Sequence, residues 1–114
     1  MTMVRQLIDR KGRNLYSVEP EDPVLEAIRQ MAEAHVGALL VMKGVELQGI
    51  ISERDYARKV ILHGRSSAET PVWQIMSSPV ITVTPEQTVQ DCMHLMTERR
   101  IRHLPVVDQG RVIA

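Results

Sequence analysis

A hydroxyl and a carboxylate stand three residues apart in Ser52-Glu53-Arg54-Asp55, directly after an apolar stretch. An ionised carboxylate only accepts hydrogen bonds, so Asp55 could hold the two vicinal hydroxyls of a ribose while Ser52 adds a further bond. The same spacing is typical of a helix start, with Ser52 as the N-cap and Asp55 as the third helical residue. Spacing alone favours the cap, and ribose binding stays open as the alternative.

Catalytic and metal chemistry find little support in the sequence. The four histidines, His35, His63, His94 and His103, have no Cys or His partner at metal-ligand spacing. No Ser-His-Asp or paired-carboxylate arrangement can be argued either. The sequence therefore predicts no catalytic residue, no metal site and no required cofactor, and the chain is not expected to be an enzyme.

The charge of the chain limits which classes of binding partner remain. Lys and Arg together number 14, as do Asp and Glu, so the formal net charge is zero. A neutral chain lacks the electrostatic footprint of a non-specific nucleic-acid binder. Only the local basic cluster Arg99, Arg100, Arg102 and His103 supports such a partner, and nucleic acid is not expected.

The cellular setting is expected to be the cytoplasm. The single cysteine, Cys92, cannot form an internal disulfide, which fits a reducing compartment. No apolar run approaches the roughly 20 residues of a membrane span, and the first residues carry no signal-peptide core.

Phe is absent, so the core must be aliphatic. Cys92 falls on an apolar helix face and is expected to be a small core residue.

The first half of the chain repeats in the second half when the sequence is shifted by 65 positions. The match needs no gap over about 25 residues, and a tandem duplication explains it. The identical pairs are Val18 and Val83, Pro20 and Pro85, Glu21 and Glu86, Val24 and Val89, Met31 and Met96, Glu33 and Glu98, Leu39 and Leu104, and Val41 and Val106.

Each repeat is expected to fold as β-α-β-β-α, which makes an α/β protein of two similar copies. Runs of β-branched and apolar residues between turn signals predict the strands, and apolar residues at helical spacing predict the helices. The predicted strands are 17–18, 36–42 and 47–51 in the first copy, and 80–83, 101–107 and 112–113 in the second.

Three helices are predicted, and their ends carry capping signals. The first includes Val24 to Ala32, with Asp22 as a plausible N-cap and Pro23 at the first helical position. The second begins at Val89, with Thr84 or Thr88 near its start. The third runs over 53–62, follows Ser52 and ends near Gly64. Arg54, Arg58 and Lys59 on this third helix are expected to face solvent, and contact with phosphates is the alternative.

The second copy is incomplete, because Ala114 aligns with Gly49 and nothing aligns with the last helix of the first copy. A strand ending at residue 114 would leave an exposed edge, so we expect that the sequence stops before its natural end. The predicted domains are 1–70, the first copy with an N-terminal segment, and 71–114, the incomplete second copy.

This organisation resembles the cystathionine-β-synthase (CBS) domain pair, or Bateman module, over nearly the whole chain. Three stretches carry the resemblance together with the repeat: Gly49-Ile50-Ile51-Ser52-Glu53-Arg54-Asp55, Val72-Trp73-Gln74-Ile75-Met76, and Arg102-His103-Leu104-Pro105-Val106-Val107. Each motif alone is weak, but together they are specific.

The resemblance implies an adenine-nucleotide site in the cleft between the copies. Asp55 and Ser52 would bind the ribose, apolar side chains would enclose the adenine, and Arg102 and His103 would contact phosphates. A solvated helix end is the alternative for the basic residues. The implied ligand residues are Ile50, Ser52, Asp55, Met76, Ser78, Pro79, Val80, Ile101, Arg102, His103, Leu104 and Pro105.

At the mirror-image site Gly37 and Ala38 align with Arg102 and His103, so the sequence predicts at most one good site per chain. The implied ligand is AMP, with ADP, ATP, NADH or S-adenosylmethionine as alternatives, and the module would act on an unknown regulated protein. A homodimer through the CBS helices is also implied. A dimerisation module without a ligand is the second hypothesis, and nucleic-acid binding the third.

Overall fold

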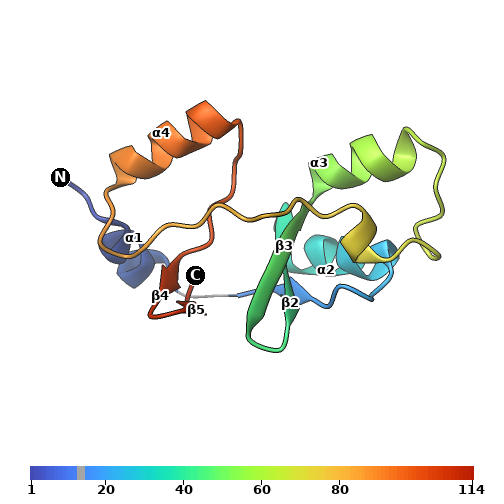
Figure 1. The fold of residues 1–114 in the computed structure, drawn as a ribbon, viewed down its shortest axis with the longest axis horizontal. Coiled ribbons are helices and arrows are strands. Elements are labelled where there is room, and N and C mark those ends of the chain that lie inside the picture. Colours follow the sequence, from blue (N-terminus) through green and yellow to red (C-terminus); the bar gives the residue numbers. More distant parts are fainter. Residues whose placement is uncertain (13–14) are drawn as a thin grey trace. The chain divides into compact units, whose positions relative to one another are not determined.

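A computed structural model describes residues 1–12 and 15–114, apart from the side chain of Lys11. By its contacts the chain divides into two compact units, one of Tyr16–Val80 and one of Met1–Leu15 with Ile81–Ala114 (Figure 1). The predicted boundary at residues 70 and 71 separates the sequence repeats and stays a prediction. The units divide the chain differently, because the segment before each copy packs with the other copy.

The unit of Tyr16–Val80 contains a three-stranded sheet. β1 (Ser17–Val18) pairs in parallel with β2 (Ala38–Lys43), which pairs antiparallel with β3 (Glu46–Ser52). Gly44, in the turn between β2 and β3, has a φ of 63°, a conformation that favours glycine. The strands predicted for the first copy are thereby confirmed, with small shifts at their ends.

Helix α2 (Val24–Ala34) covers this sheet with one apolar face. Val24, Ala27 and Met31 are spaced by three and four residues, so they share one side of the helix, and all three are buried. They belong to an aliphatic core with buried residues of the sheet and of the segments that follow it: Val18, Leu39, Val41, Ile51, Val60, Val72 and Ile75.

The third predicted helix forms and changes its winding. It begins as α3 (Glu53–Tyr56) and continues as the π-helical segment η1 (Ala57–Ile61). Gly64 follows with a left-handed φ of 64°, as expected for a helix end. The change to π-helix was not predicted. The helix buries Val60 in the core, while Ile61 and Leu62 are exposed.

The unit of Met1–Leu15 and Ile81–Ala114 has a smaller core. It contains α1 (Val4–Lys11), α4 (Val89–Arg99) and a hairpin of β4 (Val107–Asp108) and β5 (Arg111–Val112). The buried cluster of this unit consists of Val4, Ile8, Val83 and Val106.

Two predicted strands of the second copy are wrong over most of their length. Within the described residues, 80–83 and 101–107 contribute only a single parallel bridge, between Val83 and Val106, and the first residue of β4. The equivalent strand of the first copy, β2, pairs with β3 over six positions, whereas β4 and β5 pair over two. Because β4 and β5 are short, they offer few backbone groups with which a longer strand could form hydrogen bonds.

The predicted N-cap of α2 is also wrong. The Asp22 carboxylate accepts a hydrogen bond from the backbone of Glu19 at 2.9 Å, which closes a turn, and Pro23 is the N-cap. Of the two threonines expected near the start of α4, Thr88 is the cap, because its side chain accepts from the backbone N–H of Asp91. In both helices an acidic residue in the first turn, Glu26 or Asp91, favours the positive end of the helix.

The segment that precedes each copy packs with the other copy, and the two exchanges follow the same pattern. The 3₁₀ turn η2 (Val72–Gln74) packs with the first copy, and α1 packs with the second. The bonding patterns match: Val72 donates to Asp22 and Trp73 to Pro20, while Val4 donates to Gln87 and Arg5 to Pro85. Each copy is thus completed by the segment that precedes the other copy.

Candidate ligand site around Asp55

Asp55 is one of two buried polar or charged residues among those described, with 8% of its surface exposed. It lies in the first turn of α3. The Ser52 hydroxyl accepts a hydrogen bond from the Asp55 backbone at 3.1 Å, and Asp55 Oδ2 accepts from the Ser52 backbone at 3.1 Å. This reciprocal pair is a capping box, so the helix-cap interpretation is confirmed.

The carboxylate receives more hydrogen bonds than a cap requires. The Ser52 hydroxyl donates to Oδ2 at 3.0 Å, and the Ser77 hydroxyl donates to both oxygens at 3.2 and 3.4 Å. Lys59 Nζ lies 3.1 Å from Oδ1. Asp55 therefore joins the start of α3, the segment η1 and residues 75–80, the linker before the second copy.

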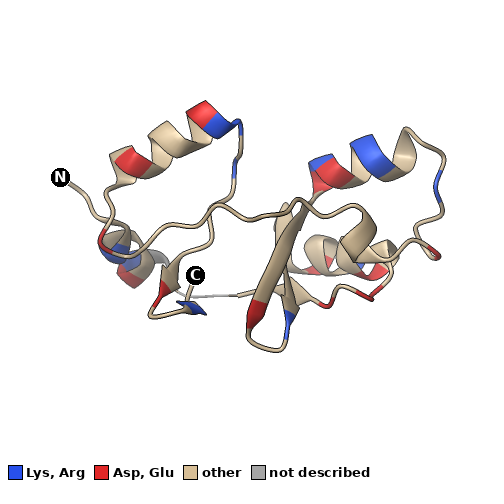
Figure 2. Ribbon diagram, viewed as in Figure 1, with Lys and Arg blue, Asp and Glu red and all other residues tan. Residues whose placement is uncertain are grey.

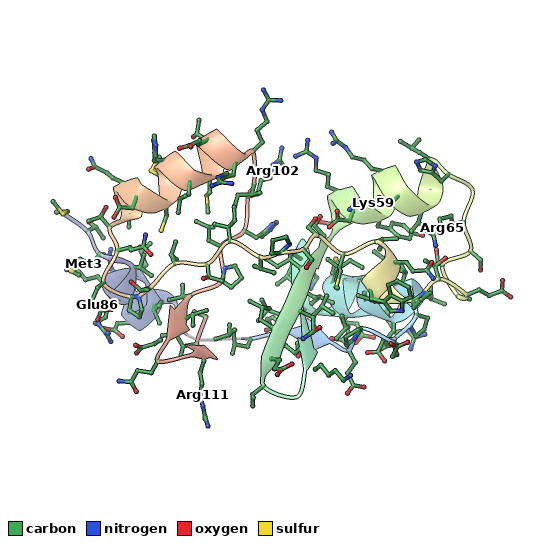
Figure 3. The ribbon with its side chains drawn as sticks, viewed as in Figure 1. Met3, Lys59, Arg65, Glu86, Arg102 and Arg111 are labelled. Carbon is green, nitrogen blue, oxygen red and sulfur yellow. The ribbon has the colours of Figure 1, made fainter. Side chains whose placement is uncertain are left out.

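Lys59 was expected to face solvent, and this was wrong. Its ammonium also donates to the backbone carbonyl of Ile75 at 2.9 Å, although 44% of the side chain is exposed. Figure 3 labels Lys59 on its helix. The expectation failed because the aliphatic stem of a lysine can carry its charge across a helix surface to an acceptor on another segment. Arg54 and Arg58, on the same helix, are exposed as predicted. Figure 2 shows basic residues in blue along this helix.

The linker lies against strand β3 next to Asp55. Ile50 and Ser77 exchange two backbone hydrogen bonds of 3.1 and 2.8 Å. Glycine suits this crossing, because a Cβ at position 49 would lie 2.6 Å from Met76 Sδ and 3.0 Å from the Ser77 carbonyl oxygen. Of the predicted ligand residues, Ile50, Ser52, Asp55 and Met76 therefore lie together.

The remaining predicted residues of this unit are less fixed by contacts. Ser78 and Pro79 are exposed and Val80 is half-buried. Ser77, which touches the Asp55 carboxylate, was missed by the sequence reasoning although its neighbours were named. A serine between Met76 and Ser78 gave no signal of its own, since only the folded linker brings it to Asp55.

The predicted phosphate and adenine residues of the second copy follow α4. Arg100 caps that helix in a left-handed conformation, and the Ile101 backbone donates to Met96. Arg102 and His103 are exposed. Leu104 is half-buried beside the core and Pro105 is buried, with its carbonyl accepting from Val83 at 3.0 Å. Their role in binding stays a prediction.

Two kinds of feature are absent from the described residues. These residues contain no cluster of three or more His, Cys, Asp or Glu side chains that could hold a metal ion. They also contain no helix that is both long and apolar enough to cross a membrane. Cys92 is a free thiol packed beside the smaller core, and burial raises its pKa above the usual value.

The chain is similar to proteins from bacteria and plants. CBSX3, a mitochondrial CBS domain-containing protein of Arabidopsis thaliana, is 50% identical over 98 residues, which are 81% of this chain and 48% of the relative. The chain thus spans about half the length of that protein. The CBS domain-containing protein YhcV of Bacillus subtilis is 33% identical over 105 residues, covering 92% of this chain and 74% of YhcV.

Solved structures show the same fold. A protein with CBS domains from Burkholderia ambifaria MC40-6 superposes with a TM-score of 0.96 at 50% identity, over 99% of this chain and 85% of that one. The CBS domain protein NE2398 gives a TM-score of 0.96 at 44% identity, over 100% and 90%. The CBS domain family model matches residues 4–62 and 72–114. The chain belongs to the CBS domain family and carries a pair of these domains.

Proposed function

We propose that this CBS domain pair is a regulatory module that binds an adenine nucleotide through Asp55. The observation that carries the proposal is a buried carboxylate already bonded to two hydroxyls, those of Ser52 and Ser77. A ribose diol presents the same kind of donor to the same acceptor. Each bond to a charged group is worth about 1.5–3 kcal/mol, so two would anchor a small ligand.

The rest of the ligand is assigned from the family resemblance. Ile50, Val80, Ile101 and Leu104 are proposed as apolar contacts of the adenine, as the family resemblance implies. Backbone groups of 76–80 are proposed to read the edge of the adenine. Arg102 and His103 are proposed phosphate contacts, and AMP is the favoured ligand over ADP, ATP, NADH and S-adenosylmethionine.

The role we assign is regulation and not catalysis. The Burkholderia protein is itself a candidate signal-transduction protein. A ligand shifts a conformational equilibrium only by its difference in affinity for the two states, so a partner protein must read the change. The cytoplasmic location stays a prediction, because the Arabidopsis relative is named as mitochondrial.

Calorimetric titration of the chain with the five ligands tests the proposal. AMP should bind with one ligand per chain, and Asp55→Ala should weaken binding by about a hundredfold or more, since it removes the ribose acceptor. Circular dichroism should establish that the variant is folded, because it also loses the side-chain half of the capping box that Asp55 supplies. Binding of AMP that is equal in the two proteins would refute the assignment of Asp55.

A second function, self-association without a ligand, is favoured by α4. This helix has no buried residue, and Met93 on it is 62% exposed. A similar structure, a hexameric CBS-CP12 protein from cyanobacteria, is 25% identical with a TM-score of 0.88. Under this function Met93→Lys should lower the mass measured by light scattering, and Asp55→Ala should leave it unchanged.

A further inference from the structure

The acceptor capacity of the Asp55 carboxylate is fully used within its own unit. Two carboxylate oxygens offer about four acceptor positions. Four donor groups occupy them: the Ser52 backbone N–H, the Ser52 hydroxyl, the Ser77 hydroxyl and the Lys59 ammonium. Any ligand that donates hydroxyls to Asp55 must therefore displace some of these groups.

Two of the four donors also hold the linker. Ser77 is a linker residue, paired with Ile50 through two backbone hydrogen bonds. Lys59 bonds Asp55 at 3.1 Å and the Ile75 carbonyl at 2.9 Å, so a single ammonium ties the carboxylate to the linker. The Ser52 donors belong to the helix cap and stay in place as long as α3 is folded.

We propose that Lys59 and Ser77 form a latch that holds the linker on the first copy and competes with a ligand for Asp55. The competition rests on the proposed function, whereas the holding of the linker does not. A bound diol takes the positions of the Ser77 hydroxyl and the Lys59 ammonium, and Ile75 to Ser77 lose their side-chain attachments. Ligand occupancy of Asp55 and attachment of the linker are thereby coupled.

The geometry indicates which contacts yield first. The Ser77 hydroxyl is shared between both oxygens at 3.2 and 3.4 Å, distances at the long end for an O–H donor, so this bond is weak. The Lys59 ammonium is partly solvated and can exchange its contact for water at small cost. The two shorter bonds from Ser52 would remain, and they hold the carboxylate in position for the ligand.

Hydrogen exchange without any ligand tests the holding of the linker. We expect the Ser77 and Ile50 amides, which pair with each other, to exchange about fivefold faster in Lys59→Gln than in the wild type, as one lost hydrogen bond predicts. Arg58→Gln, an exposed neighbour on the same helix, is the matched control and should not change these rates. Equal rates in Lys59→Gln and Arg58→Gln would overturn the latch.

Titration with adenosine tests the competition. Adenosine carries the ribose without phosphates, so a charge effect of Lys59 on a phosphate is avoided. Ser77→Ala should bind adenosine about fivefold more tightly than the wild type, because one competing donor is gone. Equal or weaker binding would overturn the competition.

The two tests also separate this inference from the proposed function. If wild-type protein binds neither adenosine nor AMP, nucleotide binding and the competition both fail. The exchange rates of Ser77 and Ile50 still decide whether Lys59 holds the linker. If AMP binds and depends on Asp55 but Ser77→Ala does not tighten adenosine, the nucleotide site stands and the competition is wrong.

Discussion

The same helix is buried in one copy of the repeat and half-exposed in the other. α2 buries Val24, Ala27 and Met31 in a core with its sheet and with Val60 of the following helix. The aligned residues of α4 are only half-buried, and the strands of the hairpin in the same unit have two residues each. The apolar pattern of a helix thus sets which face can be buried, whereas the neighbouring elements set how far it is buried.

The largest expected change in the free energy of unfolding concerns the two aligned methionines, Met31 and Met96. Met31→Ala should lower the free energy of unfolding by about 2–5 kcal/mol, because it leaves a cavity beside buried neighbours. Met96→Ala, at the aligned and half-buried position, should cost about 1 kcal/mol. Urea denaturation measures both, and equal losses would show that the two helices are packed alike.

A smaller effect is expected where the linker crosses the sheet. Gly49→Ala should cost about 1–3 kcal/mol, since its Cβ would overlap Met76 and the Ser77 backbone. Gly37→Ala is the matched control, because the nearest atom to its Cβ is the end of the flexible Glu53 side chain. The position aligned with Gly49 already carries a methyl group, at Ala114. Thermal denaturation measures both losses of stability. A loss in Gly49→Ala no larger than that in Gly37→Ala would contradict the close contact of the linker with position 49.

The smallest effect concerns the reactivity of thiols on the two helices. Burial raises the pKa of Cys92, so less thiolate is present near pH 8 and alkylation by iodoacetamide should be several-fold slower than for a free cysteine. The rate should rise with pH through the raised pKa. Cysteine placed at the aligned and fully buried position, as Ala27→Cys in a Cys92→Ala background, should react more slowly still. Faster alkylation of that variant than of Cys92 in the wild type would contradict the deeper burial of position 27.

The sequence predicted the first copy well because its elements are determined locally. Ser52 and Asp55 form a capping box within one turn of helix, and Val24, Ala27 and Met31 share a face through helical spacing alone. The family and its paired fold could also be recognised, since the repeat preserves residue types at a constant shift.

Features that depend on distant segments could not be predicted in the same way. The exchange of the preceding segments was missed, because Val4 aligns with Val72 only at a shift of 68 and not 65. Ser77 reaches Asp55 from 22 residues away, and only the docking of the linker on Ile50 brings the two together. Lys59 is four residues from Asp55 on the same helix, but its second bond, to Ile75, also depends on the docked linker. The second-copy strands were predicted too long because β propensity does not supply a partner strand.

The most direct measurement of the central claim is the affinity for AMP of Asp55→Asn beside Glu53→Gln. Both changes remove one carboxylate from the first turn of α3, but Asp55 is buried among hydroxyl donors and Glu53 is exposed. An asparagine keeps the size of the side chain and one acceptor oxygen, so the helix should remain capped. We predict that AMP binding falls at least about tenfold in Asp55→Asn and is unchanged in Glu53→Gln. Equal affinity of both variants and the wild type would contradict a ribose site at Asp55.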